Sequence, residues 1–417
     1  MIAEITDQLK ATKKSSLSLR SMDEGKQNQI LMDLASLIRN SVQEIMNENK
    51  KDLVLMDKED PKYDRLLLTK ERIEAMAADV ETVAALPYSM KKILEQRKLP
   101  NGLIIQKVSV PLGVIAIIYE SRPNVTLDAF TLCFKTGNAC VLKGGKEAYS
   151  TNLFLVSLIH RLLQQHGINE SIIYLLPLGK EAVYTLLKAN HFLDVCIPRG
   201  SQSLINFVRE NTTIPFIETG AGIVHIYFDE SGDKQKGRVI IENAKTRRVS
   251  VCNALDILVI HKARLNDLPF IIERLAEKHV EIFADRPSYQ AIKSFYPKNL
   301  LRKATSSDFC QEFLSYKMAI KTVNALEEAV THIMEHSSGH SEAIIAEDQA
   351  SIHYFLDHID SAAVYVNAST AFTDGAQFGM GAEIGISTQK LHARGPMSLD
   401  ALSSYKWVVL GEGHIRP

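Results

Sequence analysis

Residues 139–177, "ACVLKGGKEAYSTNLFLVSLIHRLLQQHGINESIIYLLP", change their hydrophobic pattern twice. The stretch opens with a short apolar run that ends in a Gly turn, and it closes with a second apolar run before Pro177. Between the two runs, apolar residues recur every three to four positions up to Gly167, which is typical of an amphipathic helix ended by glycine. We therefore predict a strand–helix–strand unit, and with it a parallel sheet.

The same alternation continues on both sides of this stretch. Further strands are predicted at 111–120, 192–201, 224–231, 254–261 and 281–285. Helices are predicted at 179–189, 201–211, 238–248 and 268–279. Residues 1 to about 100 read as helical, and the alternating segment 103–110 reads as an exposed or edge strand. The predicted fold class is α/β, with a doubly wound parallel sheet.

The composition is that of an ordinary globular protein. A chain of 417 residues predicts two or three domains. Its 48 basic and 49 acidic side chains give no electrostatic footprint for nucleic acid or a membrane surface. The apolar runs are about half as long as a membrane helix requires. Five widely spaced cysteines, without a zinc-like pattern, favour a reducing cytoplasm over a disulfide framework.

Two Gly turns follow predicted strands. The first turn contains Lys143, Gly144, Gly145 and Glu147, and the second contains Gly200 and Ser201. Ligands of open α/β sheets bind beyond the carboxyl ends of the strands, and helix N-termini attract phosphate. Neither turn matches G-x-G-x-x-G, so a plain tight turn and a nucleotide-binding turn both remain open.

Cys252 stands directly before a strand in "RRVSVCNALDILVIH" (247–261). One interpretation is a small buried hydrophobe, the usual place of a cysteine in a cytosolic protein. The other is a nucleophile at a strand end, whose thiol Arg247 and Arg248 would activate if they pointed at it. Among the five cysteines, Cys252 is the best placed for catalysis.

Two further segments stand out by composition. His332, His336 and His340 are spaced four apart, but "SSGHS" breaks the pattern, so we predict a solvated loop and no metal site. Residues 376–396 are rich in glycine and carry Glu383, which predicts a loop that either lies on the surface or forms a wall over a site.

Four blocks carry a family resemblance. They are "VPLGVIAIIYESRPNVTLDAF" (110–130), "GNACVLKGGKEA" (137–148), "NAKTRRVSVCNALDILVIH" (243–261) and "LHARGPMSLDALSSYKWVV" (391–409). In sequence and order they resemble the aldehyde dehydrogenase superfamily, and within it the gamma-glutamyl phosphate reductases. The resemblance covers roughly residues 10–417, so it is more specific than any single Gly turn.

The resemblance implies an aldehyde dehydrogenase-like architecture. A dinucleotide-binding domain would take up residues 1–228, with late segments at about 361–395 returning to it. An α/β catalytic domain with Cys252 would span 229–360. A small β region at 100–112 and 396–417 would mediate oligomerisation, giving a homodimer or homotetramer.

The implied activity is NADPH-dependent reduction of L-glutamate 5-phosphate to L-glutamate 5-semialdehyde, with release of phosphate through a cysteine thioester. This is the second step of proline biosynthesis, and a separate glutamate 5-kinase would make the substrate. Two alternatives remain open: an NAD(P)-dependent semialdehyde dehydrogenase that oxidises an aldehyde to the acid, and an inactive coenzyme-binding protein.

The resemblance also implies roles for individual residues. Cys252 is the nucleophile, and its backbone N–H with the side chain of Asn124 would stabilise the oxyanion. Glu218 matches the general base of oxidising members. Lys143 and Glu383 match residues that hold the two riboses, and Gly200 and Ser201 match the turn beside the pyrophosphate. Lys143 and Lys146 are the nearest candidates for the NADP 2′-phosphate.

Overall fold

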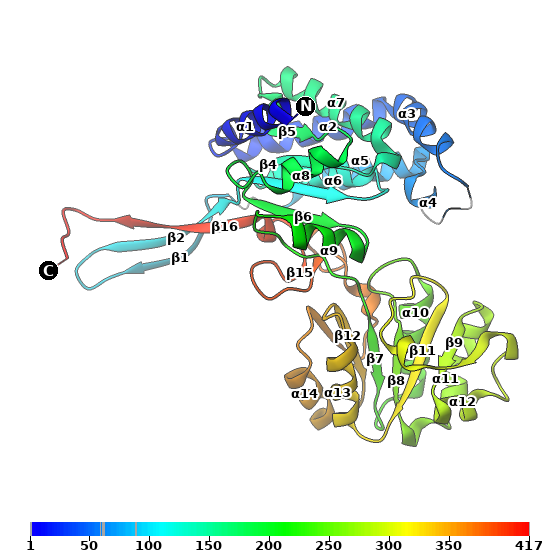
Figure 1. Ribbon diagram of the computed structural model, residues 1–417. Helices are drawn as coiled ribbons and strands as arrows, with labels where there is room; N and C mark the ends of the chain where they lie inside the picture. The colour runs from blue at the N-terminus through cyan, green and yellow to red at the C-terminus, as the bar shows by residue number, and fades with distance from the viewer. Residues whose placement is uncertain (1, 59, 61–62, 88–89, 417) are drawn as a thin grey trace. The chain divides into compact units, whose positions relative to one another are not determined.

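The computed structural model describes residues 2–416 apart from 59, 61–62 and 88–89, and the chain forms two compact units (Figure 1). The first unit comprises Met1–Thr219, Gly379–Gly385 and Pro396–Pro417. The second comprises Gly220–Phe378 and Ile386–Gly395. The first boundary lies at 219, where the resemblance implies 228. The roles implied for the domains stay predictions.

The first unit contains a four-stranded parallel sheet in the order β5-β4-β3-β6, surrounded by helices. Its elements are α1 (Ile2–Leu19), α2 (Glu24–Asn40), α3 (Val42–Val54), α4 (Tyr63–Leu66), α5 (Lys70–Ala85), β3 (Val114–Tyr119), α6 (Asn124–Lys135), β4 (Ala139–Lys143), α7 (Tyr149–Gln165), β5 (Ile173–Leu175), α8 (Lys180–Leu187), β6 (Val195–Arg199) and α9 (Gln202–Asn211). As predicted, α7 ends beside Gly167, which has φ +66°. From β3 the chain adds β4 and then β5 on one side of the sheet, and it returns to add β6 on the other side of β3. The strand order therefore reverses between β3 and β6.

A three-stranded antiparallel sheet extends away from the rest of the first unit (Figure 1). It joins β1 (Ile93–Lys98), β2 (Ile104–Pro111) and β16 (Ser403–Leu410) in the order β1-β2-β16. The strand predicted at 103–110 is confirmed, but its prediction as an exposed or edge strand is wrong, because β1 and β16 pair with its two edges and the strand is half-buried. The helical prediction for residues 93–98 is wrong, because this polar segment pairs with β2 and forms a strand.

The second unit contains a seven-stranded parallel sheet in the order β10-β9-β11-β8-β7-β12-β13. Its main elements are β7 (His225–Phe228), α10 (Lys234–Thr246), β8 (Ile257–His261), α11 (Leu268–Glu277), β9 (Glu281–Ala284), α12 (Arg286–Ile292), β10 (Leu301–Lys303), β11 (Lys317–Val323), α13 (Leu326–His336), β12 (Ser341–Ile345), α14 (Gln349–His358) and β13 (Ala363–Val366). The short segments β14 (Ile386–Ser387) and β15 (Gly395–Pro396) follow.

The strands of the second sheet are buried on both faces. Along β7, Ile226 and Phe228 pack into the cluster formed with α10, α11 and α12, while Tyr227 packs into the opposite cluster with α13 and α14. This two-sided burial explains the continuous apolar runs that predicted parallel strands. The α/β fold class is therefore confirmed.

The histidine-rich segment differs from its prediction. His332 and His336 lie on α13, and their rings stack with centroids 4.3 Å apart. His332 and His340 are buried, and burial lowers the pKa of His332 to about 3. The solvated-loop prediction is wrong, because α13 continues through His336, and His332 on this helix and His340 beyond it are both buried. Within the described ranges, no group of three or more His, Cys, Asp or Glu side chains is arranged to hold a metal ion.

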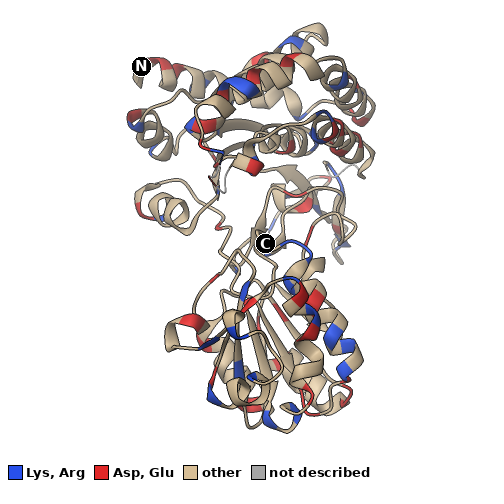
Figure 2. Ribbon diagram, turned by 90° about the vertical axis from the view of Figure 1, so that its right-hand side faces the viewer, with Lys and Arg blue, Asp and Glu red and all other residues tan. Residues whose placement is uncertain are grey.

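Acidic and basic side chains are mixed on both units, as Figure 2 shows. Among the described residues, no helix is both long enough and apolar enough to cross a bilayer.

Candidate active site

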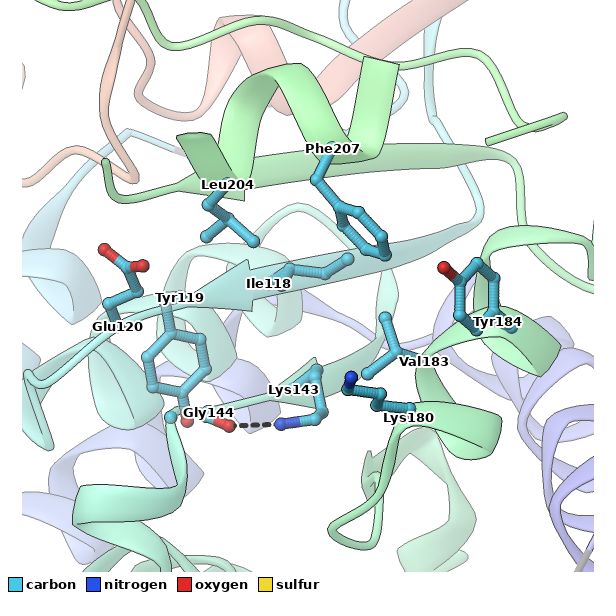
Figure 3. Close-up of a pocket in the computed structure, with 11 residues that line it drawn as sticks. Ile118, Tyr119, Glu120, Lys143, Gly144, Lys180, Val183, Tyr184, Leu204 and Phe207 are labelled. Atoms are coloured by element: carbon cyan, nitrogen blue, oxygen red, sulfur yellow. Dashed lines mark hydrogen bonds between the residues drawn. The ribbon is translucent and has the colours of Figure 1, made fainter. Parts of the chain in front are cut away.

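A cavity of about 320 Å³ opens at the carboxyl edge of the first unit's sheet (Figure 3). It lies beyond the ends of β3 and β4 and between α8 and α9, beside the point where the strand order reverses. Its walls are formed by Ile118, Tyr119, Glu120, Lys143, Gly144, Gly145, Lys180, Val183, Tyr184, Leu204 and Phe207. This is the position at which open α/β sheets bind nucleotides.

The cavity combines an apolar wall with two ammonium groups. Tyr184 and Phe207 meet edge to face with ring centroids 5.7 Å apart. Lys143 donates from Nζ to the carbonyl of Gly144 at 2.6 Å, and burial lowers the pKa of Lys143. Lys180 lies on the same wall as Lys143 (Figure 3). The cavity can therefore stack an aromatic base and bind hydroxyl or phosphate oxygens.

The first Gly turn is built for close approach. A Cβ on Gly144 would lie 2.2 Å from Nδ2 of Asn152, so a larger residue cannot replace it without movement. Glu147 does not line the cavity. Its carboxylate accepts hydrogen bonds from the backbone and hydroxyl of Ser121 and so fixes the segment that follows β3. Lys146 is exposed at the start of the next short helix.

The carboxylate of Glu120 is hydrogen-bonded to the second Gly turn. Glu120 accepts a hydrogen bond from the Ser201 N–H at 2.9 Å and another from its Oγ at 3.0 Å. A Cβ on Gly200 would lie 2.6 Å from the same carboxylate. Glu120 therefore occupies the donors that an anion at the start of α9 would use. The pyrophosphate role of Gly200 and Ser201 stays a prediction.

Asn124 begins α6, immediately after the segment that follows β3. Its Nδ2 donates to Oδ2 of Asp128, one helical turn later, at 2.9 Å. Burial raises the pKa of Asp128 to about 6. An amide that is oriented by a neighbouring carboxylate has its second N–H in a defined direction, as an oxyanion donor needs.

Two further glutamates occupy the first unit. Glu218 is half-buried and forms an ion pair with Arg209 of α9. Glu383 is also half-buried, and its loop is held by paired backbone bonds from Ile384 to Met397 at 2.9 Å and from Met397 to Gly385 at 2.8 Å. The roles predicted for both glutamates stay predictions.

Cys252 lies in a tight turn of the second unit, between the end of α10 and the start of β8. The Ala254 N–H closes the turn on the Val251 carbonyl at 3.2 Å. The Cys252 side chain is half-buried. The sequence predicted this position, in a turn just before a buried strand.

Burial argues against three of the other four cysteines as nucleophiles. Cys133, Cys140 and Cys196 are buried, and burial raises the pKa of Cys196 to about 12. Cys310 is exposed beyond a short 3-10 helix. A thiol reacts as thiolate, so a deeply buried cysteine is a poor nucleophile. Cys252 is only half-buried, and it lies in a turn whose backbone is held in place.

Contacts from two sides hold the backbone of the Cys252 turn, and we call these contacts the clamp. On one side, a Cβ on Gly222 would lie 1.7 Å from the Cys252 carbonyl oxygen, so the two backbones are in direct contact. On the other side, Asn253 donates from its side chain to the Thr373 carbonyl at 3.0 Å, and its own carbonyl accepts from Oγ1 of Thr370 at 2.9 Å. These contacts fix the backbone on both sides of the cysteine.

A buried ion pair lies behind the same turn. Lys245 of α10 donates to the Leu255 carbonyl at 2.8 Å and lies 3.9 Å from Oδ1 of Asp256. Asp256 also accepts from the Phe313 N–H at 3.0 Å. Burial lowers the pKa of Lys245 and raises that of Asp256. The pair ties α10, the turn and β8 together.

The structure thus brings Lys143, Gly144 and Gly145 to one cavity, and it adds residues that the sequence analysis missed: Glu120, Lys180, Tyr184 and Phe207. Lys180 follows β5 at the start of α8, so the rule that ligands bind beyond strand ends could have identified it. The aromatic residues gave no such signal, because their spacing within each helix is that of ordinary packing.

The comparisons with solved structures place this fold in a known class. An acetylating aldehyde dehydrogenase from Geobacillus thermoglucosidasius superposes with a TM-score of 0.72 at 17% identity, covering 100% of this chain and 98% of that chain. The fold is therefore aldehyde dehydrogenase-like. No protein-family model matches the chain.

The sequence comparisons define the family. Gamma-glutamyl phosphate reductase from Legionella pneumophila (strain Paris) is 57% identical over 416 residues, 100% of both chains. The same enzyme from Chlorobaculum parvum is 57% identical over 99% of this chain and 98% of its own. A crystal structure of gamma-glutamyl phosphate reductase from Thermotoga maritima has a TM-score of 0.95 at 38% identity, covering 99% and 100% of the two chains. The chain belongs to the gamma-glutamyl phosphate reductase family, and the resemblance seen in its four sequence blocks is confirmed.

Proposed function

We propose that the protein reduces L-glutamate 5-phosphate to L-glutamate 5-semialdehyde, with NADPH as reductant and with release of phosphate. The supporting observation is the 57% identity over the whole chain to curated enzymes of this name. The reaction is an oxidoreductase step of proline biosynthesis. Its acyl phosphate substrate has to come from phosphoryl transfer to glutamate, which a separate glutamate 5-kinase would perform.

The chemistry rests on Cys252. Its thiolate attacks the acyl carbonyl, the new C–S bond forms, and the C–O bond to phosphate breaks with the electron pair leaving on phosphate. A reduced nicotinamide coenzyme, when bound, would supply the hydride for the thioester carbon. The C–S bond then breaks with its electron pair going to sulfur, which releases the aldehyde and restores the Cys252 thiolate. Two electrons enter in all, and phosphate is the only group that the substrate loses.

Each tetrahedral species carries an oxyanion that needs preorganised donors. We assign these donors to the Cys252 backbone N–H and to Nδ2 of Asn124. The orientation of Asn124 by Asp128 supports this assignment, and the clamp on the Cys252 turn supports a fixed backbone donor.

The cavity of the first unit suits the adenosine end of a dinucleotide. Gly144 and Gly145 give the close approach, and the Tyr184–Phe207 pair gives an apolar wall for the adenine. Lys143 would hold the ribose, and Lys143 with Lys180 would hold a 2′-phosphate. Lys146 remains a second candidate for that phosphate. Glu383 is assigned to the nicotinamide ribose by family resemblance alone.

Loss of either cavity lysine should weaken NADP⁺ binding. In Lys143→Gln and Lys180→Gln, the KM for NADP⁺ should rise by about tenfold, and that for NAD⁺ by less, because a charge-assisted bond to the phosphate is lost. Steady-state kinetics of semialdehyde oxidation measures both constants. Lys188→Gln is the matched control, since Lys188 is exposed at the other end of α8 and lines no part of the cavity. An equal rise for both coenzymes would remove the 2′-phosphate assignment.

The rival activity is irreversible oxidation of the aldehyde, with Glu218 as the base that activates water. The ion pair between Glu218 and Arg209 argues against this role, because the carboxylate that would have to contact the water is engaged by the guanidinium group. A reductase that releases phosphate needs no such base.

Phosphate dependence separates the candidate functions. Glutamate 5-semialdehyde and NADP⁺ should yield NADPH only when phosphate or arsenate is present, since phosphate is the acyl acceptor in the reverse reaction. Absorbance at the NADPH band measures the rate. Turnover without phosphate would instead establish the oxidising dehydrogenase. Coenzyme binding without any turnover would leave a binding protein.

We also propose that the β1-β2-β16 sheet mediates homo-oligomer formation. Tyr405, Trp407 and Val409 alternate along β16 and are each about half exposed. Exposed apolar side chains on one strand of a small sheet are typical of an interface. Sedimentation should give a mass two or four times that of the 46.6-kDa chain, and a monomer would contradict the proposal.

A further inference from the structure

Two oppositely charged side chains lie at the carboxyl edge of the first unit's sheet, outside the cavity described above. Arg199 is the last residue of β6, opposite Tyr119 at the end of the neighbouring parallel strand β3. Asp128 lies on the second turn of α6, the helix that follows β3. The two residues therefore come from either side of the place where the strand order reverses, which is where open α/β sheets bind ligands.

The two charges are near each other but are not paired. The charge of Arg199 acts on the Asp128 carboxyl and lowers its pKa against the larger, opposite effect of burial. Nevertheless, no ion pair joins the two side chains among the described residues. Asp128 accepts a hydrogen bond from Asn124, and Nη1 of Arg199 is buried without a hydrogen-bond partner in that part of the chain. A buried guanidinium nitrogen is normally hydrogen-bonded, so Nη1 of Arg199 is available to a further partner, and the half-buried Asp128 carboxylate can accept more than the one bond from Asn124.

The substrate carries a matching pair of charges. L-Glutamate 5-phosphate has an α-ammonium and an α-carboxylate on one carbon, three carbons from the reacting carbonyl. We propose that Asp128 binds the α-ammonium group and that Arg199 binds the α-carboxylate. This inference rests on the proposed function, and it assigns the recognition of the amino-acid end to two residues of the first unit.

The contact between Asp128 and Asn124 links this recognition to catalysis. Asn124, the proposed oxyanion donor, already gives one hydrogen bond to Asp128 at 2.9 Å. A bare carboxylate beside a developing oxyanion opposes the reaction, because like charges repel. The ammonium group of a correct substrate cancels that charge. A substrate without the α-amino group would leave it uncompensated.

A substrate-variant cycle tests the assignment to Asp128. In the phosphate-dependent oxidation, glutamate 5-semialdehyde is compared with 5-oxopentanoate, which lacks only the α-amino group. Asp128→Asn should lower kcat/KM for the natural aldehyde by about 10²-fold and leave that for 5-oxopentanoate unchanged or raised, because the substitution removes the partner of the ammonium group for one substrate and an uncompensated charge for the other. An equal loss on both substrates would overturn the assignment, since that is the result expected of structural damage.

Arg199 is tested with the complementary analogue. Arg199→Gln should lower kcat/KM for glutamate 5-semialdehyde by about 10²-fold, spare 4-aminobutanal, which lacks the carboxylate, and leave the KM for phosphate unchanged. A raised KM for phosphate would instead place the departing phosphate on Arg199 and overturn its assignment.

Asp79→Asn is the matched control for Asp128, because Asp79 lies on α5, is exposed, and its charge also acts on the Asp128 carboxyl.

Failure of the proposed function would be seen separately. In that case the wild-type chain gives no phosphate-dependent turnover with any aldehyde. Calorimetry with L-glutamate then tests the same pair: weaker binding by Asp128→Asn and Arg199→Gln supports the inference, and binding that neither substitution weakens overturns it.

Discussion

Replacement of Cys252 by alanine should lower kcat by about 10⁴-fold or more, since removal of a covalent nucleophile leaves only binding and oxyanion stabilisation. The half-buried thiol sits on a turn that is clamped from both sides, whereas Cys133, Cys140 and Cys196 are buried. The dissociation constant for NADPH should stay within about twofold, because the coenzyme cavity lies in the first unit and contains no part of the Cys252 turn.

The measurement is phosphate-dependent NADPH formation, with coenzyme affinity followed by fluorescence. Cys310→Ala is the matched control, because Cys310 is exposed in the same unit and lies outside the turn. It should retain the wild-type rate. Substantial activity in Cys252→Ala would remove the thioester from the mechanism.

Gly222→Ala should lower kcat by about 10²-fold, because a displacement of about 1 Å at a reacting group has an effect of this size. The added Cβ would lie 1.7 Å from the Cys252 carbonyl oxygen and 3.0 Å from its Cα. Both contacts are to backbone, so no side-chain rotation can relieve them. The turn itself must move, and the nucleophile with it.

The rate of alkylation of Cys252 by iodoacetamide tests the cause independently of turnover. We expect a changed rate in Gly222→Ala, with thermal unfolding followed on the same sample. Gly25→Ala makes the same chemical change on α2, where the nearest atom to the new Cβ is 3.2 Å away, and should behave as wild type. An unchanged alkylation rate together with a lowered melting temperature would show that Gly222 serves stability alone.

The fold was predictable to the extent that strands are buried on both faces. Runs such as residues 257–260 are apolar throughout because both sides of the sheet are covered, and that signal is local. Strand β1 has no such signal. Its sequence, "ILEQRK", is mostly polar and exposed, and it becomes a strand only by pairing with β2. Pairing partners are not visible in a local pattern.

The candidate site was predictable where chemistry and position coincide. The two Gly turns follow strands and Cys252 precedes one, which makes them candidates, and the family resemblance assigns them roles that stay predictions. Asp128 and Arg199 could not be recognised in this way. Their significance lies in a missing ion pair between segments far apart in the chain, and a missing contact leaves no trace in composition or periodicity.

The order of segments along the chain has a consequence for synthesis on the ribosome. β16 pairs with β2 from Ser403 opposite Pro111 to Leu410 opposite Ile104, and Nδ2 of Asn138 donates to the Leu402 carbonyl at 2.8 Å. The whole second unit is translated between these partners. While that unit is being made and folds, β2 presents an unpaired edge on a nascent chain, and such edges recruit other chains. The interval before β16 emerges is therefore when the nascent chain is most open to pairing with other chains.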